Sequence, residues 1–411
     1  MPGTLPDRNG PIIFSRRGLT AAFCVVAGLA LTACGGGQFG DFGNFGNFGQ
    51  PGPAGQQLPP QAEAAIGTGE VRVGLILPLS AQGNAGVAAQ SMKNAAQLAL
   101  AEFKNPNIQL LVKDDAGTPQ GAQAGAQQAL SEGAQIILGP LFAESVRAVA
   151  QVAHPANVPV IAFSTDSSVA SSGVYLLSFL PETDVKRIVD YAASHGRRSF
   201  AALIPDNAYG AVVQGAFQQE VPRRGGRVIV LQKYPNDPSQ LAGPVSAVAQ
   251  EARRVDSIFI PDTADSVVQI VQALVADRVD LKRVQLLGTG LWQDEHIFAT
   301  QALHGALYPG PDPTSFRNFS ARYRARFGQD PVRTASLAYD AVALVAALVK
   351  TQGPQPFTEQ ILTNSSGFAG IDGIFRFRPN GTNERGLAVL RVGPTGPQIV
   401  SPAPHSFGPG T

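Results

Sequence analysis

Short apolar runs alternate with longer amphipathic stretches from Val71 onward. The runs are rich in β-branched residues and are bounded by turn residues, which predicts strands, whereas the stretches between them have helical spacing. This alternation is typical of parallel sheets, and strands that are apolar almost throughout indicate a sheet covered on both faces. The first series predicts strands at 71–77, 108–112, 135–139 and 158–164, and helices at 84–103, 119–130 and 144–154.

A second series of the same kind follows. It predicts strands at 199–204, 227–231, 257–261 and 285–290, and helices at 209–222, 239–253 and 264–276. Two such series in tandem predict an α/β protein of two lobes, each with a doubly wound parallel sheet. The last part departs from this rhythm: helices are predicted at 314–327 and 334–350, and a hairpin over 373–392 that turns at Asn380-Gly381.

The N-terminal segment has the pattern of an export signal. Arginines precede an apolar run over 18–33 that is too short for a membrane span of about 20 apolar residues, which predicts a cleaved signal peptide at 1–33. Leu31-Thr32-Ala33-Cys34 resembles the lipobox of bacterial lipoproteins, and this resemblance implies that Cys34 is acylated and becomes the new N-terminus. The stretch 15–20 partly resembles a twin-arginine signal, but Gly18 departs from it, so the export route stays open.

A Gly-, Phe- and Pro-rich stretch separates Cys34 from the first strand. Its phenylalanines, at positions 39, 42, 45 and 48, are each followed by glycine, and ordering such a chain costs more than its small apolar area gains. We therefore predict a flexible tether over 34–69, with a root-mean-square span of roughly 30 to 35 Å. The alternative is that these phenylalanines contact a partner or lipid.

Composition restricts the class of partner. The 411 residues include two cysteines, and cleavage before Cys34 leaves one thiol, so no disulfide is expected and the fold depends on a large buried core. A formal net charge of +1 with 15% charged residues argues against a nucleic-acid partner. A small molecule or a protein is the expected partner.

Open α/β sheets bind ligands beyond the carboxyl ends of their strands. The loops at these positions mix hydroxyls, carboxylates and helix-start amides, which suits a polar or zwitterionic ligand, while Phe142, Tyr209 and Trp292 add flat apolar walls. Each Ser, Asp or Asn has an equal alternative role as a helix cap or turn residue, and for Asp114 and Asp115 the structural role is favoured.

Catalytic and cofactor motifs are not found. The stretch 288–293 begins like a dinucleotide fingerprint, but Gln293 stands where the third glycine is needed. His296 and His304 are eight residues apart and no other histidine lies close to either, so metal-ligand spacing is not met, and no serine sits between glycines as a strained nucleophile. We predict a binding protein with no cofactor, no metal and no catalytic residue.

Several segments in order resemble the type I periplasmic solute-binding fold of the leucine-binding protein family. They are "VRVGLILPLS", "VKDDAGTPQGA", "ILGPLFAES", "VPVIAFSTDSS", "LIPDNAYG" and the late "FRNFSARYRARFGQDP", and the resemblance extends over about 71–400. Within that family the chain resembles a lipoprotein branch related to the penicillin-binding protein activators. The resemblance implies a three-segment hinge whose closure traps a ligand. It assigns 71–180 and 303–368 to lobe one and 181–302 and 369–402 to lobe two, with 403–411 as a disordered tail.

The same resemblance implies site residues. Amino-acid binders of the family hold the ligand carboxylate after the third and fourth strands, at positions that correspond here to 143–145 and 164–166; Tyr209 matches a stacking tyrosine and Asp262 is the candidate for gripping an ammonium group. Where those binders have serines, this chain has Phe142-Ala143-Glu144, which removes hydroxyl donors, adds a negative charge and favours a more apolar cleft. The predicted ligand-binding residues are Ser80, Leu141, Phe142, Ser145, Ser164, Thr165, Tyr209, Asp262 and Trp292.

Two functions remain open from the sequence. The first is a membrane-anchored periplasmic receptor that closes on an amino acid or similar metabolite and presents it to an inner-membrane ABC permease. The second is an activator-like lipoprotein that stimulates a peptidoglycan synthase by protein contact. Gly35, which follows the predicted lipidated cysteine, favours the second function. In enteric lipoproteins an Asp at this position favours retention in the inner membrane, and its absence suggests placement in the outer membrane. Which membrane holds the anchor stays open.

Overall fold

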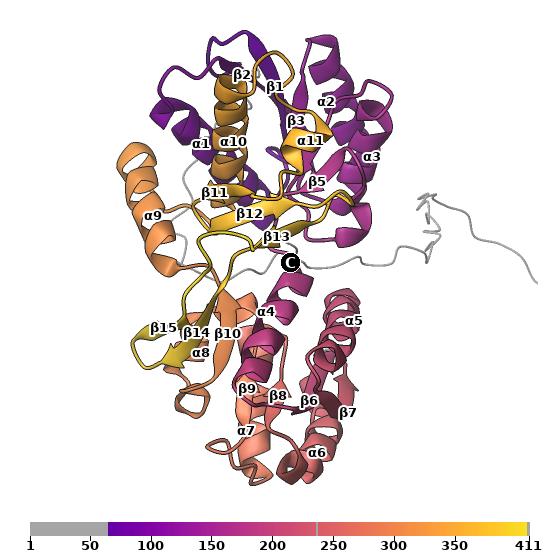
Figure 1. Ribbon diagram of the computed structural model, residues 1–411, viewed down its shortest axis with the longest axis vertical. Coiled ribbons are helices and arrows are strands. Elements are labelled where there is room, and N and C mark those ends of the chain that lie inside the picture. Colours follow the sequence, from indigo (N-terminus) through magenta and orange to yellow (C-terminus); the bar gives the residue numbers. More distant parts are fainter. Residues whose placement is uncertain (1–64, 236, 409–411) are drawn as a thin grey trace, which may run out of the picture. The chain divides into compact units, whose positions relative to one another are not determined.

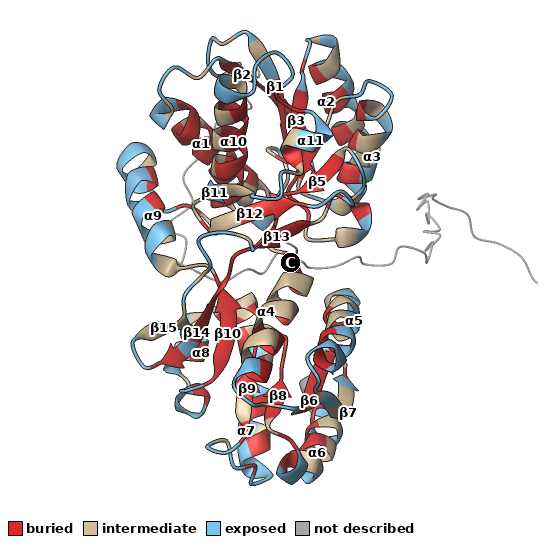
Figure 2. Ribbon diagram, in the orientation of Figure 1, coloured by how far each residue is buried: buried red, intermediate tan, exposed pale blue. Residues whose placement is uncertain are grey.

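The computed structural model describes residues 65–235 and 237–408 (Figure 1). The predicted signal peptide, Cys34 and nearly all of the tether lie outside the described residues. Two parallel sheets organise the rest, as the sequence predicts, and Figure 2 shows buried strands flanked by helices whose outer faces are exposed. Within the described residues, no helix is both long enough and apolar enough to cross a membrane.

Lobe one contains a five-stranded parallel sheet in the order β2-β1-β3-β4-β5. Helices α1 and α10 cover one face and α2 and α3 the other, each through a separate apolar core. The strands are β1 (Val71–Leu77), β2 (Ile108–Asp114), β3 (Ile136–Leu138), β4 (Val160–Ala162) and β5 (Val174–Leu176). The helices are α1 (Asn84–Glu102), α2 (Pro119–Ser131), α3 (Ala143–Ala153), α9 (Pro313–Phe327), α10 (Ala335–Thr351) and α11 (Glu359–Leu362).

Lobe two contains a seven-stranded sheet in the order β15-β14-β10-β9-β8-β6-β7, in which β14 runs antiparallel to both of its neighbours, β10 and β15, while the other pairs are parallel. Helices α4 and α5 cover one face, and α6 and α7 the other. The strands are β6 (Ser199–Pro205), β7 (Arg227–Tyr234), β8 (Ser257–Phe259), β9 (Gln285–Leu287), β10 (Leu307–Gly310), β14 (Ala388–Gly393) and β15 (Gly396–Ser401). The helices are α4 (Pro181–Ser194), α5 (Ala208–Arg223), α6 (Ala242–Glu251), α7 (Ala264–Ala276) and α8 (Glu295–Ala299).

A small antiparallel sheet packs against lobe one. It consists of β11 (Phe368–Gly370), β12 (Gly373–Phe377) and β13 (Asn383–Arg385). Strands β12 and β13 form the predicted hairpin across Asn380-Gly381, where Gly381 has a φ of 82° that a glycine adopts without strain. The hairpin is shorter than predicted, because after β13 the chain leaves this sheet and enters β14 in lobe two.

Two predicted lobe boundaries need correction. Leu303 lies in the lobe-two core and β10 belongs to the lobe-two sheet, so the chain returns to lobe one at 311–312 rather than at 303. Phe375 and Phe377 lie in the lobe-one core, so the last crossing falls at 386–387 rather than at 368. Both shifts have the same cause: an apolar strand belongs to the core that buries it, which the linear pattern of residues does not specify.

The prediction of a disordered tail at 403–411 is wrong for residues 403–408, which the structure describes. Ala403 packs against the lobe-two core, and the Phe407 ring lies 4.5 Å from the Arg376 guanidinium carbon on the small sheet. Gly367 accommodates this ring, since a Cβ there would lie 2.8 Å from a ring carbon of Phe407. The C-terminal segment therefore runs from lobe two back to the lobe-one side.

Candidate functional site

The predicted ligand loops lie at the carboxyl ends of both parallel sheets. The chain leaves lobe one after β5 and enters lobe two at the start of α4, and it leaves lobe two after β10, so the crossings join these same ends of the two sheets (Figure 1). One hydrogen bond spans them directly: the Ser167 hydroxyl in lobe one donates to Glu182 Oε1 at the start of α4, at 2.5 Å. The geometry thus brings the two sets of loops to one end of each lobe.

The start of α3 combines a helix end that has no side-chain cap with a buried serine. Phe142 precedes the helix and provides no side-chain hydrogen bond to its first amides. The Ser145 hydroxyl, in the first turn, is buried at 1% exposure and has no hydrogen-bond partner among the described residues. Because unpaired amides and the helix dipole make a helix start attractive to anions, this end of α3 is suited to a carboxylate.

Apolar surface lies beside this helix start. Phe142 is 38% exposed, whereas Leu141 is half-buried and packs against the lobe-one core. The loop reaches this position through Gly139, whose φ is 92° and where a Cβ would lie 2.0 Å from the Ile76 carbonyl oxygen on β1. Only glycine fits so close to the neighbouring strand.

The negative charge that Glu144 adds is neutralised locally. Arg147, one turn further along α3, forms an ion pair with Glu144, donates to the Ser168 hydroxyl at 3.0 Å and lies 3.7 Å from Asp166. Such exposed pairs contribute little stability. They do, however, leave neither carboxylate unpaired near the start of α3, so the expected repulsion of a ligand carboxylate is reduced.

Residues after β4 and β2 mainly shape turns. The Ser164 hydroxyl, at 4% exposure, accepts from the Asp166 amide at 3.1 Å, and Thr165 beside it is half-buried. Asp114 accepts from the amides of Ala116 and Ser80, at 2.9 and 3.2 Å. Burial by itself would raise the pKa of Asp114, but the hydrogen bonds outweigh it, so the pKa is lowered. Ser80 itself is exposed.

Asp115 takes a structural part in the same turn. It is fully buried and accepts from the Gly117 amide at 2.8 Å. Burial, with the neighbouring charge of Asp114, raises the Asp115 pKa to about 6 against the effect of that hydrogen bond. Both aspartates therefore hold the β2–α2 turn, as the sequence favoured.

Lobe two presents two tyrosines and an aspartate at its carboxyl edge. The Tyr209 hydroxyl lies 2.9 Å from the Thr289 hydroxyl, and burial raises the pKa of Tyr209. Asp262, at 9% exposure, accepts from the Tyr234 hydroxyl at 2.6 Å and from the Thr263 amide at 2.7 Å. A carboxylate has room for further donors, so these bonds still leave Asp262 able to bind a cationic group.

Trp292 lies in the core instead of at a ligand surface. Its side chain is fully buried and its indole nitrogen donates to the Ile260 carbonyl at 3.1 Å. Gly288 makes room for the ring, because a Cβ there would lie 2.1 Å from it. The predicted apolar wall is therefore absent at this position, and Gly288 of the "GTG" stretch serves the packing of the indole ring.

Sequence reasoning missed the acids at the start of α4. Asp184 accepts from the Gly290 amide at 2.8 Å, and burial together with the charge of Glu182 raises its pKa to about 7. Glu182 accepts from Ser167 with one oxygen, while its other oxygen is buried without a hydrogen-bond partner. The signal was present: Pro181 followed by acids is a helix start.

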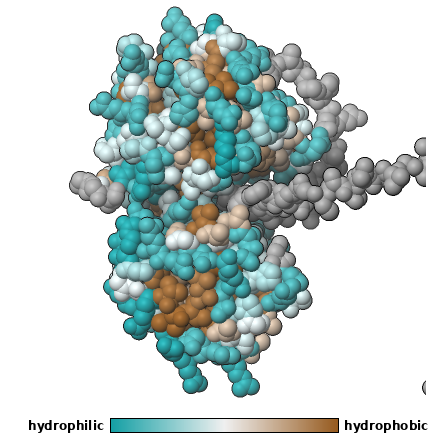
Figure 3. Space-filling view, turned by 90° about the vertical axis from the view of Figure 1, so that its right-hand side faces the viewer, coloured by the Kyte–Doolittle hydropathy of each residue, from teal (hydrophilic) through white to brown (hydrophobic). Residues whose placement is uncertain are grey.

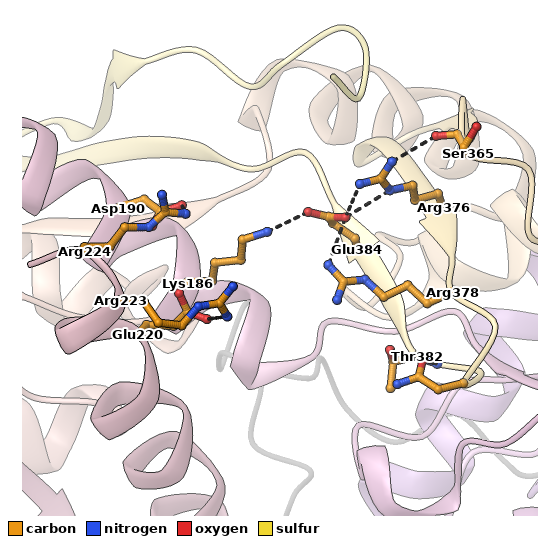
Figure 4. A network of polar contacts seen from close by, with 11 residues as sticks. Lys186, Asp190, Glu220, Arg223, Arg224, Ser365, Arg376, Arg378, Thr382 and Glu384 are labelled. Atoms are coloured by element: carbon orange, nitrogen blue, oxygen red, sulfur yellow. Dashed lines mark hydrogen bonds and ion pairs between the residues drawn. The ribbon is translucent and has the colours of Figure 1, made fainter. Parts of the chain in front are cut away.

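Buried charges hold the crossing segments together. Glu384 on β13 accepts from Lys186 on α4 at 2.9 Å, from Arg376 on β12 at 2.7 Å and from Arg378 at 3.1 Å (Figure 4). On the other face of the same strand, Asn383 and Arg385 both donate to the Ser178 carbonyl, at 2.7 and 2.9 Å. Two crossing segments are thereby joined to each other and to α4.

The geometry of two linked α/β lobes agrees with a sequence comparison. Residues 70–397 match the family of periplasmic binding proteins. The chain belongs to this family, in its type I, leucine-binding division.

Members of the family with solved structures share the fold. A branched-chain amino acid ABC transporter periplasmic ligand-binding protein from Burkholderia xenovorans superposes with a TM-score of 0.66 at 18% identity, covering 83% of this chain and 96% of that one. A solute-binding protein of an ABC transporter from Rhodopseudomonas palustris, in complex with 3,4-dihydroxybenzoic acid, has a TM-score of 0.57 at 22% identity, covering 82% and 97%. At this identity the likeness concerns the fold.

A second group of relatives has another role. The penicillin-binding protein activator LpoA of Escherichia coli is 25% identical over 163 residues, which is 39% of this chain and 23% of LpoA. The chain spans between 20% and 48% of the length of the first curated relatives it matches.

Proposed function

We propose that this protein is a periplasmic receptor that closes its lobes on a small carboxylate-bearing solute, an amino acid or an aromatic acid, for import by an ABC transporter. The observation that carries the proposal is the start of α3, where uncapped amides meet the buried, unpartnered hydroxyl of Ser145. A polar atom buried without a partner costs about 1 to 3 kcal/mol, and a bound carboxylate would remove that cost.

The surrounding groups support a solute with a second polar end. Ser164, Thr165 and Ser80 would flank the carboxylate, Phe142 and Leu141 would contact its apolar part, and lobe two would supply Tyr209 and Asp262. The second end would be an ammonium group or a hydroxyl that donates to Asp262. Trp292 has no part in this site.

The lipid anchor belongs to the proposal. Acylation of Cys34 would fix the protein to a periplasmic membrane face, and the tether of 34–69 would let the folded body reach a permease. Mass spectrometry of the membrane-extracted protein tests this, since a diacylglycerol-modified Cys34 as the first residue is expected and an intact residue 1 is not.

Differential scanning fluorimetry of the purified protein with amino acids and aromatic carboxylates tests the receptor. A hit is expected to raise the melting temperature in wild type, and Ser145→Ala should weaken binding about tenfold or more by loss of one hydrogen bond to a charged group. Ser131→Ala, on the exposed end of α2, is the matched control and should bind as wild type does. Absence of any shift across both classes, or equal affinity of Ser145→Ala, contradicts the receptor.

The match to LpoA favours a second candidate, contact with a peptidoglycan synthase. In that case the tethered body would stimulate the synthase as a protein partner, with no solute bound. Pull-down of a class A penicillin-binding protein by the purified chain, together with a flat fluorimetry screen, would select this function over the first.

A further inference from the structure

The free edge of the lobe-two sheet combines three features of a docking site. Strand β7 lies at the end of the sheet order. Among the described residues it pairs with β6 along one edge, and no strand pairs with its other edge. Backbone donors and acceptors on an outer edge are available to a further strand. The other two features are its apolar surface and the charge beside it.

Four consecutive apolar residues line this edge. Val228, Ile229, Val230 and Leu231 are each half-buried: Ile229 and Val230 pack against one core of lobe two and Val228 and Leu231 against the other, and each keeps part of its surface exposed. Figure 3 shows a hydrophobic patch on this side of lobe two, bordered by hydrophilic residues toward the end of the lobe. Ile229 is an extra residue opposite β6, after which pairing is regular from Val230 to Tyr234.

Basic side chains gather where β7 begins. Each of the four connections that lead from a helix into β6, β7, β8 or β9, counted with the residues that flank it, carries at least two of them. The loops are neighbours: Arg198 donates to the Arg224 carbonyl at 2.9 Å, and Arg283 to the Val255 carbonyl at 3.1 Å. The group consists of Arg197, Arg198, Arg223, Arg224, Arg227, Arg253, Arg254, Arg278, Lys282 and Arg283.

Part of this positive charge is uncompensated. Arg223 and Arg254 form ion pairs with the glutamates three residues before them, and Arg224 pairs with Asp190. Arg227 and Arg253, by contrast, are exposed and have no ion pair among the described residues. Basic residues at helix C-termini stabilise helices in general. That role alone does not account for the group, because the corresponding helix ends of lobe one have few basic residues: Lys104 follows α1, the acidic Glu132 follows α2 and His154 follows α3.

We propose that β7 docks an extended segment of a partner protein, which adds as a strand with alternating apolar residues and carries acidic residues at the end beside Arg227. The partner is inferred to be a peptide and not a phosphate-rich surface. Phosphate groups would need only the basic side chains, whereas an added peptide strand would also use the apolar residues and the unpaired backbone groups of β7. The acidic end follows from charge complementarity. This surface is separate from the proposed solute site, so either proposal can fail without the other.

Synthetic peptides test the proposal on the purified full-length protein. The probes share an alternating threonine-valine core and end in three aspartates or three lysines, at either terminus, and binding is measured by fluorescence anisotropy at low salt. The aspartate peptide should bind about tenfold or more tightly than the lysine peptide. N-methylation of alternate amides should abolish binding, because a methylated amide cannot donate to an edge strand.

Charge reversal supplies the matched comparison. Arg227→Glu should reverse the preference between the two peptides, whereas Arg317→Glu, the same change on exposed α9, should leave it unchanged. Equal binding of both peptides, no binding at millimolar concentration, or full binding of the methylated peptide overturns the proposal. Binding to phosphatidylglycerol vesicles that Arg227→Glu removes, without peptide binding, would overturn it in favour of a membrane surface.

Discussion

Glu384 is the sharpest test of how the crossing segments are held. This carboxylate, 11% exposed, accepts from Lys186, Arg376 and Arg378, and these partners outweigh burial and lower its pKa from 4.5 to about 2. Glu384→Gln keeps the shape and one acceptor but removes the charge. The buried Arg376 then loses its counter-ion, and removing one member of a buried pair is costly.

The pKa gives the magnitude and its pH dependence. A depression from 4.5 to about 2 corresponds to about 3 kcal/mol of native-state stability at neutral pH. Because the folded pKa lies below the unfolded one, this stability is fully present above pH 4.5 and is lost as pH falls toward 2. At pH 3 less than half of it should remain.

Urea unfolding at pH 7 and pH 3 measures this effect. The unfolding free energy of Glu384→Gln should be about 3 kcal/mol below wild type at pH 7, and the gap should shrink by more than half at pH 3. Glu251→Gln, which breaks an exposed pair with Arg254, is the control and should cost less than about 1 kcal/mol. Equal stability at pH 7, or a gap that does not change with pH, would refute the reasoning.

Three other changes have defined outcomes. Gly288→Ala should lower the unfolding free energy by about 1 to 3 kcal/mol in urea titrations, because its Cβ would meet an indole ring, whereas Gly215→Ala, with open space around it, should not destabilise. Burial and the charge of Asp372 raise the Asp340 pKa from 3.8 to about 7, so native stability should fall as pH rises between these values. Thermal melts from pH 5 to 8 should show a melting temperature that depends less on pH for Asp340→Asn than for wild type. The same pH dependence in both proteins would contradict this. Phe407→Ala should expose residues 402–408 to limited proteolysis, while unchanged cleavage would show that the ring does not hold this segment.

The sequence contains enough local signal for most of the two sheets. The predicted strand at 71–77 and helix at 264–276 coincide with β1 and α7, because each presents its own periodicity to the core. Helix α4 is not among the predicted helices, although Pro181 and the acids in its first turn are a local helix-start signal. The ion pair between Glu144 and Arg147 has i,i+3 spacing and could have been predicted locally.

Other features depend on contacts that no local pattern contains. Trp292 is buried because Ile260 supplies an acceptor and Gly288 supplies space, and a lone tryptophan after a strand is equally compatible with a ligand wall. The placement of Phe407 depends on Arg376 in β12 and on Gly367 just before β11, both distant from it in the sequence. Such long-range pairings are specified by the packed fold and not by the spacing of residues.

The two proposals use different parts of lobe two, and this has a consequence for signalling. The solute site involves the carboxyl ends of its strands, where Tyr209 and Asp262 lie, whereas the docking edge begins at Arg227, at the amino end of β7. Hinge closure moves a lobe as a rigid body, so it changes neither the backbone of β7 nor the charges beside it. A ligand shifts a binding equilibrium only through a difference in free energy between two states. The aspartate peptide should therefore bind with equal affinity in the presence and absence of solute, and a partner that senses the solute must contact lobe one as well.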